Sequence, residues 1–166
     1  PELWSAKFAR TRGLDPATFE AEVMPFFKGP FQDALIGKAD LKQIIAPWLK
    51  RWPQTGTVDE FLAEWFQAEH FIDSELLEEV ERLRSDGLKI YVATNQEKYR
   101  TKYMLNEMGF ARQFDGMLAS YDLGAVKPDI AFFAAAYARL CRKQAAGNTP
   151  GVNSGNHTPE VKEAGE

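Results

Sequence analysis

The chain has 166 residues, of which 45% are hydrophobic and 13% aromatic, enough to build the core of one globular domain or two small ones. Its net charge of -4 comes from 24 acidic and 20 basic residues without long blocks of either sign, which excludes the concentrated basic face of nucleic-acid-binding proteins. A single cysteine, Cys141, precludes an intrachain disulfide, and nothing in the sequence resembles a signal peptide or an apolar run of about 18 residues or more. We therefore expect a cytoplasmic protein with no nucleic-acid or membrane partner.

Residues 1–72 are predicted to form an all-helical module. All four tryptophans and eight of the twelve phenylalanines lie in this module, whereas all five tyrosines follow it. Apolar residues at helical spacing, separated by glycine and proline, predict helices over residues 2–10, 16–27, 40–50 and 58–69. Asp15 and Thr57 are the expected N-caps, and Glu60 completes a capping box with Thr57. We expect the aromatic side chains to pack helix against helix.

Residues 73–143 are predicted to form a partial α/β core. The expected elements are a helix over 73–87, a strand over 88–94, a helix over 95–109, a strand over 114–120 and a helix over 127–143. This alternation predicts an incomplete, Rossmann-like parallel sheet, and such sheets bind ligands at the carboxyl ends of their strands. Residues 144–166 contain no aromatic, leucine or isoleucine residue and are predicted to be a disordered tail.

Residues at the ends of the two predicted strands could bind a ligand or take part in catalysis. Thr94 and Asn95 lie where a strand ends and a helix begins, so a hydroxyl and the N–H groups of the first helical turn would suit an anion such as phosphate. The alternative is that either residue only caps the helix. Lys127 precedes a proline on the loop after the second strand, from which its ammonium group could reach the same spot. A lone lysine is usually a solvated surface residue, so only the combination is specific.

The two histidines and the cysteine, which are common metal ligands, are not predicted to form a metal site. His157 lies in the predicted tail, and His70 ends an aromatic helix with no cysteine or second histidine nearby. Cys141 has no neighbouring histidine and is expected to act as a small apolar residue on a helix. No metal site is predicted from these side chains.

A strand ending in Thr-Asn, a helix closing on "MGF", and then "FDGMLAS" and "GAVKPD" ahead of a phenylalanine pair closely resemble the haloacid dehalogenase superfamily of hydrolases. The resemblance covers residues 2–140, and the helices of residues 1–72 resemble the helical cap of its phosphatase-like members. It implies that Thr94 hydrogen-bonds a transferring phosphoryl group and that Lys127 offsets the charge shared by phosphate and an aspartate nucleophile. The implied substrate is a small phosphomonoester, and the implied cofactor is Mg²⁺.

The chain departs from that family at both catalytic ends. The nucleophile motif, Asp-x-Asp, does not occur in the sequence, and no two aspartates are adjacent, as they commonly are in the family's Mg²⁺ loop. Asp115 in "FDGML" lacks the second aspartate and lies on the wrong strand. Pro1 in place of an initiator methionine is typical of processing or of a fragment. We therefore expect a truncated chain that binds no Mg²⁺ and is inactive as given.

A sheet of only two parallel strands is not a stable core by itself. Either another chain supplies the missing strands, or the protein depends on its helical module and on self-association. Three functions remain open. They are a Mg²⁺-dependent phosphatase by descent, a haloacid dehalogenase as the lesser enzymatic alternative, and a non-catalytic remnant or interaction module whose exposed helix faces bind a partner or a second copy.

Overall fold

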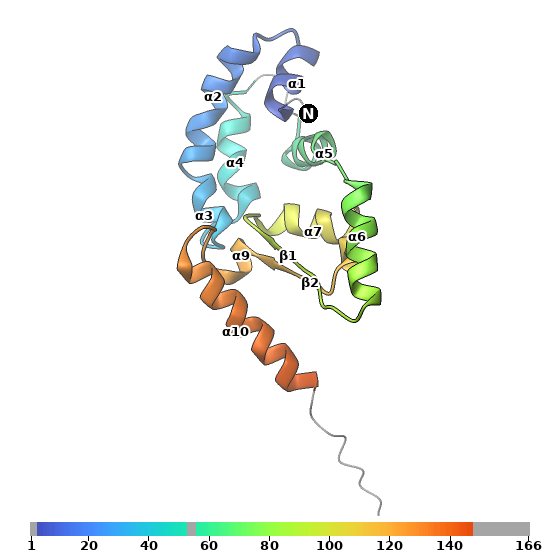
Figure 1. Ribbon diagram of the computed structural model, residues 1–166. Helices are drawn as coiled ribbons and strands as arrows, with labels where there is room; N and C mark the ends of the chain where they lie inside the picture. The colour runs from blue at the N-terminus through green and yellow to red at the C-terminus, as the bar shows by residue number, and fades with distance from the viewer. Residues whose placement is uncertain (1–2, 53–55, 148–166) are drawn as a thin grey trace, which may run out of the picture.

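The computed structural model describes residues 3–52 and 56–147 and has an α/β fold with a small parallel sheet. The helical module consists of α1 (Trp4–Thr11), α2 (Pro16–Lys28), α3 (Phe31–Leu35), α4 (Leu41–Leu49) and α5 (Val58–Ala68). The α/β module consists of α6 (Ser74–Ser85), β1 (Tyr91–Thr94), α7 (Lys98–Asn106), α8 (Phe110–Gln113), β2 (Gly116–Ala119), α9 (Ser120–Leu123) and α10 (Ile130–Gly147). Figure 1 shows the helical module above the strands, with α10 extending away below them.

Local capping starts the helices where the sequence predicts. The Asp15 carboxylate accepts a hydrogen bond from the Thr18 amide at 2.9 Å, at the start of α2. Thr57 and Glu60 form the predicted capping box at the start of α5, and the Asp73 carboxylate caps α6. These bonds satisfy amide groups that a helix leaves unpaired at its first turn. The predicted N-caps Asp15 and Thr57 are therefore confirmed.

The larger hydrophobic core lies inside the helical module. Its aromatic side chains pack mostly edge to face, with Trp4 in contact with Phe8 and Trp65. Fifteen buried residues form this core: Trp4, Phe8, Ala9, Phe19, Val23, Phe26, Ala34, Leu41, Ile45, Leu49, Trp52, Phe61, Leu62, Trp65 and Phe66. Burying a side chain of the size of leucine or phenylalanine contributes about 2 kcal/mol to the stability of the fold. The module therefore supplies most of the apolar burial in the chain, as its aromatic content predicts.

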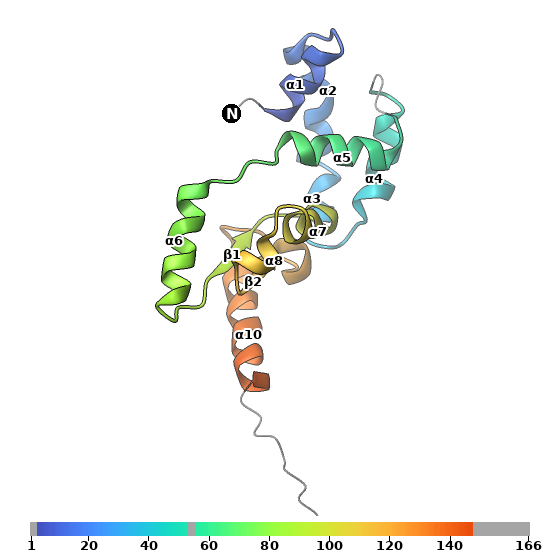
Figure 2. The ribbon, with the colours of Figure 1, turned by 90° about the vertical axis from the view of Figure 1, so that its right-hand side faces the viewer.

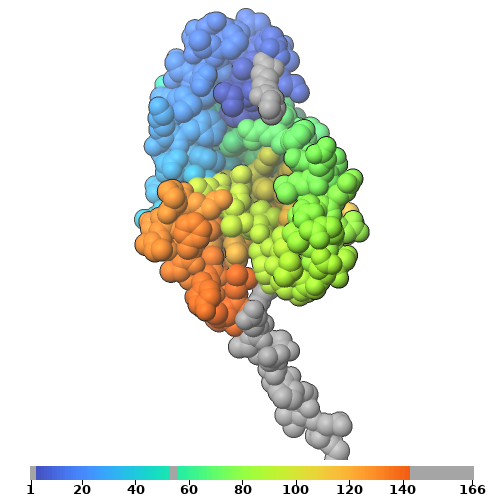
Figure 3. All heavy atoms as spheres, viewed as in Figure 1, coloured from blue at the N-terminus to red at the C-terminus, as the bar shows by residue number. Residues whose placement is uncertain are grey.

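The core beneath the sheet is much smaller. β1 and β2 pair in parallel, with Tyr91 opposite Gly116 and Thr94 opposite Ala119, and the described residues add no further strand. The buried residues of this second core are Leu118, Phe132 and Ala136. Parallel sheets usually carry helices on both faces, yet the strand region reaches the surface between α6 and α10 in Figure 3. The sheet therefore relies on contacts with the helical module.

Arg100 on α7 joins the two modules. Its guanidinium donates hydrogen bonds to the carbonyl oxygens of Phe66 and Glu69, at 2.9 and 3.0 Å, where α5 ends. The same group lies over the Phe66 and Tyr103 rings. Figures 1 and 2 both show α7 between α5 and the strands. The α/β module is thus attached through a buried cation that satisfies the unpaired carbonyl groups of a helix end.

Several predicted boundaries are wrong. The strands are shorter than predicted, and α7 begins at Lys98 instead of residue 95. The short helices α3, α8 and α9 were not predicted, because four or five residues are too few to show helical periodicity. Residues 144–147 of the predicted tail belong to α10, since Ala145 and Ala146 favour a helix. The rest of the predicted tail, with His157, lies outside the described residues.

No helix within residues 3–52 and 56–147 combines the length and the apolar character that a membrane crossing needs.

A tight contact between α3 and α9 gives a stability test. Gly37 has a φ of +72°, and a Cβ added there would lie 2.3 Å from the Tyr121 carbonyl oxygen. We expect Gly37→Ala to lower the free energy of unfolding by about 3 kcal/mol, through overlap with backbone as well as the positive φ. Gly13 has a φ of +67° with no atom within 4 Å of an added Cβ, so Gly13→Ala should cost only about 1 kcal/mol. Urea unfolding of both variants measures the difference, and equal losses would contradict the contact.

Candidate functional site

The carboxyl ends of the two strands bring Thr94 and Lys127 to one edge of the sheet. Thr94 is the last residue of β1 and pairs with Ala119, the last residue of β2. Lys127 lies on the loop between α9 and α10, and its ammonium group donates to the Ala93 carbonyl oxygen at 2.6 Å. Within the described residues, no hydrogen bond engages the Thr94 hydroxyl. Thr94 and the Lys127 ammonium group therefore lie at the same edge of the sheet, the edge at which α/β folds bind ligands.

Asn95 positions the lysine loop. Its side-chain oxygen accepts from the Lys127 amide at 2.7 Å, and its side-chain nitrogen donates to the Lys127 carbonyl oxygen at 2.9 Å. The Asn95 amide group thus bonds both backbone groups of Lys127. Asn95 acts here as a backbone clamp, a role that neither of the sequence-based alternatives, anion binding or helix capping, described.

The N-terminus of α7 is not free to bind an anion. The Glu97 carboxylate accepts hydrogen bonds from the amides of Tyr99 and Arg100, and only 1% of Glu97 is exposed. Burial raises the pKa of Glu97, which the two backbone hydrogen bonds oppose. The prediction that helical N–H groups beside Thr94 point at a phosphate is therefore wrong, because an internal carboxylate occupies that position.

A cavity of about 340 Å³ lies next to this edge, between the two modules. Its polar lining includes Lys38, Asp40, Glu97, Lys98 and Tyr121. The hydroxyl of the neighbouring Tyr99 donates to Asp40 at 2.7 Å, which raises the pKa of Tyr99 to about 12 and lowers the pKa of Asp40. Thr94 and Lys127 do not line this cavity. The lining mixes positive and negative groups and favours neither sign of ligand.

The backbone of the loop around Gln96 is held by hydrogen bonds from α9, the short helix that follows β2. The Ser120 hydroxyl and the Tyr121 amide both donate to the Gln96 carbonyl oxygen, at 3.2 and 3.3 Å. Ser120 is fully buried. The segment between β1 and α7 is therefore held by α9 on one side and by the Lys127 loop on the other.

The other candidate ligands are engaged elsewhere. Asp115 accepts from the Ile90 amide at 2.9 Å and pairs with Arg84 and Lys89, and these contacts lower its pKa. His70 shares a hydrogen bond with Tyr103 at 2.8 Å. Among the residues that the structure describes, no three histidine, cysteine, aspartate or glutamate side chains are grouped to hold a metal ion.

Comparisons of the chain with protein-family models, with curated proteins and with solved structures found no match.

The Asn95 clamp can be tested by mutation. Asn95→Ala leaves the amide and carbonyl groups of Lys127 without their partners, so we expect a loss of about 2 kcal/mol in unfolding free energy and faster hydrogen exchange at the Lys127 amide. The matched control is Asn106→Ala, at an exposed position of α7, which should change stability by less than about 0.5 kcal/mol. Unchanged exchange at Lys127 in Asn95→Ala would contradict the clamp.

Proposed function

We propose that this chain carries the phosphate-binding half of a hydrolase of the haloacid dehalogenase type, with the helical module as its cap and a small phosphomonoester as its ligand. The observation that carries the proposal is the position of the Lys127 ammonium group, 2.6 Å from the Ala93 carbonyl oxygen and beside Thr94 at the carboxyl edge of a parallel sheet. A cation and a hydroxyl at that edge suit the negative charge of a phosphoryl group.

The same proposal makes the chain non-catalytic by itself. Phosphoryl transfer of this type needs a carboxylate nucleophile, and the sequence contains no Asp-x-Asp. Two carboxylates that adjoin the strands, Glu97 after β1 and Asp115 before β2, are unsuited to the role. Glu97 caps α7, and Asp115 is bound at the opposite end of β1, to the Ile90 amide. A phosphate would therefore bind at this edge without being transferred.

Two measurements test this proposal. We expect p-nitrophenyl phosphate to be hydrolysed no faster by the chain than by buffer, with or without Mg²⁺, and orthophosphate to bind weakly, with a Kd on the order of 1 mM. Lys127→Gln removes the cation and should weaken phosphate binding about fivefold or more, whereas Lys89→Gln, at the other end of β1, should leave it unchanged.

Turnover that disappears in Lys127→Gln would contradict the non-catalytic assignment. Phosphate binding that is absent, or equal in both lysine variants, would contradict the phosphate site itself. The two failures are distinct, because one concerns the nucleophile and the other concerns the cation.

A second candidate function is self-association through α10. One face of this helix buries Phe132 and Ala136 against the sheet, while the opposite face exposes Ile130, Phe133 and Tyr137, with exposed fractions of 78%, 49% and 72%. We call the exposed residues of α10 between Ile130 and Cys141 the outer face; they are Ile130, Ala131, Phe133, Ala134, Tyr137 and Cys141. None of them is charged, which is unusual for a solvated helix surface.

The charges at the two ends of the outer face favour a second copy as its partner. Asp129 precedes the face, Arg142 follows it, and both are exposed. In an antiparallel pair related by a two-fold axis between Ala135 and Ala136, Asp129 of one copy lies at the same height along the helix axis as Arg142 of the other, and Tyr137 at the same height as Ala134. Residues 148–166 are poor candidates to cover the face, because Val152 and Val161 are their only large apolar residues.

Sedimentation across a concentration series tests this association. We expect a monomer–dimer equilibrium that Phe133→Glu shifts to monomer, because a charge would be buried in the interface. Leu76→Glu replaces a residue of 57% exposure on α6 and should leave the equilibrium unchanged. Asp129→Arg should weaken the dimer, and adding Arg142→Asp should restore it. A monomer at every concentration, or association unaffected by Phe133→Glu, would contradict this interface.

A further inference from the structure

A pocket in the helical module has the character of a separate ligand site. It lies between α1 and α5, encloses about 270 Å³, and shares no residue with the Thr94–Lys127 edge. At about 30 Å³ per water molecule, this volume corresponds to a ligand of about ten non-hydrogen atoms. Half-enclosed apolar pockets of this kind are where proteins bind small organic molecules.

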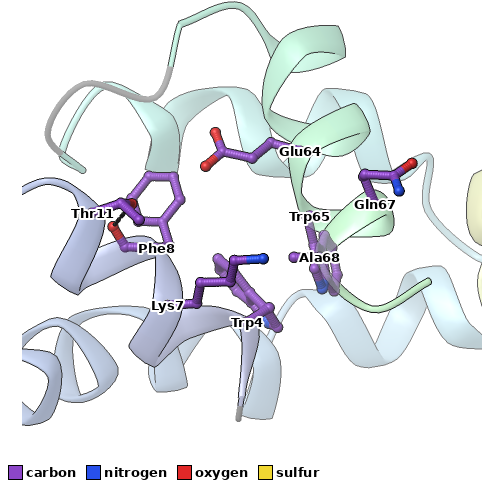
Figure 4. Close-up of a pocket in the computed structure, with 8 residues that line it drawn as sticks. All are labelled: Trp4, Lys7, Phe8, Thr11, Glu64, Trp65, Gln67 and Ala68. Carbon is purple, nitrogen blue, oxygen red and sulfur yellow. Dashed lines mark hydrogen bonds between the residues drawn. The ribbon is translucent and has the colours of Figure 1, made fainter. Parts of the chain in front are cut away.

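The walls of the α1–α5 pocket are aromatic side chains that are held in place by contacts with one another in the core. Trp4, Phe8 and Trp65 line it, and all three side chains are buried in the core of the helical module. Their rings contact one another, with centroids 6.0 Å apart for Trp4 and Phe8 and 5.4 Å apart for Trp4 and Trp65. Ala68 on α5 leaves space between them (Figure 4). An apolar ligand body would therefore meet preorganised aromatic surfaces.

The charges around the pocket select an anion. Figure 4 shows the Lys7 amino group pointing from α1 towards α5, into the space beside Ala68. Glu64 also lines the pocket, but both of its carboxylate oxygens accept from Arg12, at 2.8 and 2.7 Å. The Arg12 guanidinium in turn lies 3.6 Å from the centre of the Phe8 ring. The Glu64 charge is thus paired with Arg12, and among the described residues no ion pair engages Lys7.

We propose that the α1–α5 pocket binds a small organic carboxylate with an aromatic body, its carboxylate paired with Lys7 and its ring packed against Trp4, Phe8 and Trp65. Aromatic walls also suit organic cations, but the Lys7 ammonium group would repel a cation, and the Glu64 charge is already paired. The chain therefore carries a monoanion site that is independent of the phosphate edge.

Phenylacetate is the test ligand, because it combines one ring with one carboxylate. Binding can be followed by tryptophan fluorescence, since Trp4 and Trp65 border the pocket, and by calorimetry. We expect saturable binding with a Kd on the order of 1 mM, and at least fivefold weaker binding of phenethylamine, which carries the opposite charge on a similar body.

Three variants locate the site. Lys7→Gln should weaken phenylacetate binding about fivefold, and Ala68→Leu should abolish it by filling the space. Lys50→Gln removes an exposed lysine that caps α4 and should leave binding unchanged. Thermal unfolding of each variant establishes that it is folded.

Absence of saturable binding would overturn the proposal, as would equal affinity for the two charged ligands. Binding that survives both Lys7→Gln and Ala68→Leu in folded proteins would place the ligand elsewhere and would also overturn it.

Discussion

A buried guanidinium holds together a molecule whose sheet has little core of its own. Arg100 is 9% exposed and lies between the end of α5 and the ring of Tyr103. Charged hydrogen bonds to backbone carbonyl groups contribute about 1.5–3 kcal/mol each, and here they also satisfy carbonyl groups that no helical amide reaches. Burial lowers the pKa of Arg100 and the nearby Glu69 carboxylate raises it, but an arginine keeps its charge in either case. The thin core of Leu118, Phe132 and Ala136 thus gains stability from the aromatic core above it.

The same attachment determines the geometry of the sheet edge at which Thr94 and Lys127 lie. α7 is fixed against α5 by Arg100, so Glu97 and the end of β1 are fixed with it. Hydrogen bonds from Asn95 and Ser120 then hold the connecting loop and Lys127. The site is therefore preorganised by contacts with side chains and loops, whereas a wider parallel sheet would hold such residues by the pairing of further strands.

Features governed by neighbouring residues could be predicted, and features governed by distant contacts could not. Asp15 and Thr57 cap their helices through bonds to residues three positions away, so the sequence contains both partners. Asn95 is also a preferred N-cap residue, yet its amide group bonds Lys127, and Glu97, a less common capping residue, caps α7 instead. Nothing in the sequence near Arg100 predicts that its side chain is buried. The charged residues around it in "EKYRTKY" predict an exposed side chain. Arg100 is buried because it bonds carbonyl groups at the end of α5, which is distant in sequence.

The Lys127 ammonium group has a neutral partner at the carboxyl edge of the sheet. Lys127 donates to a neutral carbonyl oxygen, which is a weaker partner for an ammonium group than a carboxylate would be. The Ala93 side chain beside that oxygen is exposed, so this edge of the sheet is accessible to solvent. Glu97 is close to Lys127's partner Ala93 in sequence, but its carboxyl group is directed to the amides of α7. Under the proposed function, a phosphate at this edge would replace a carbonyl as the partner of Lys127 without displacing an ion pair, and this exchange would favour its binding.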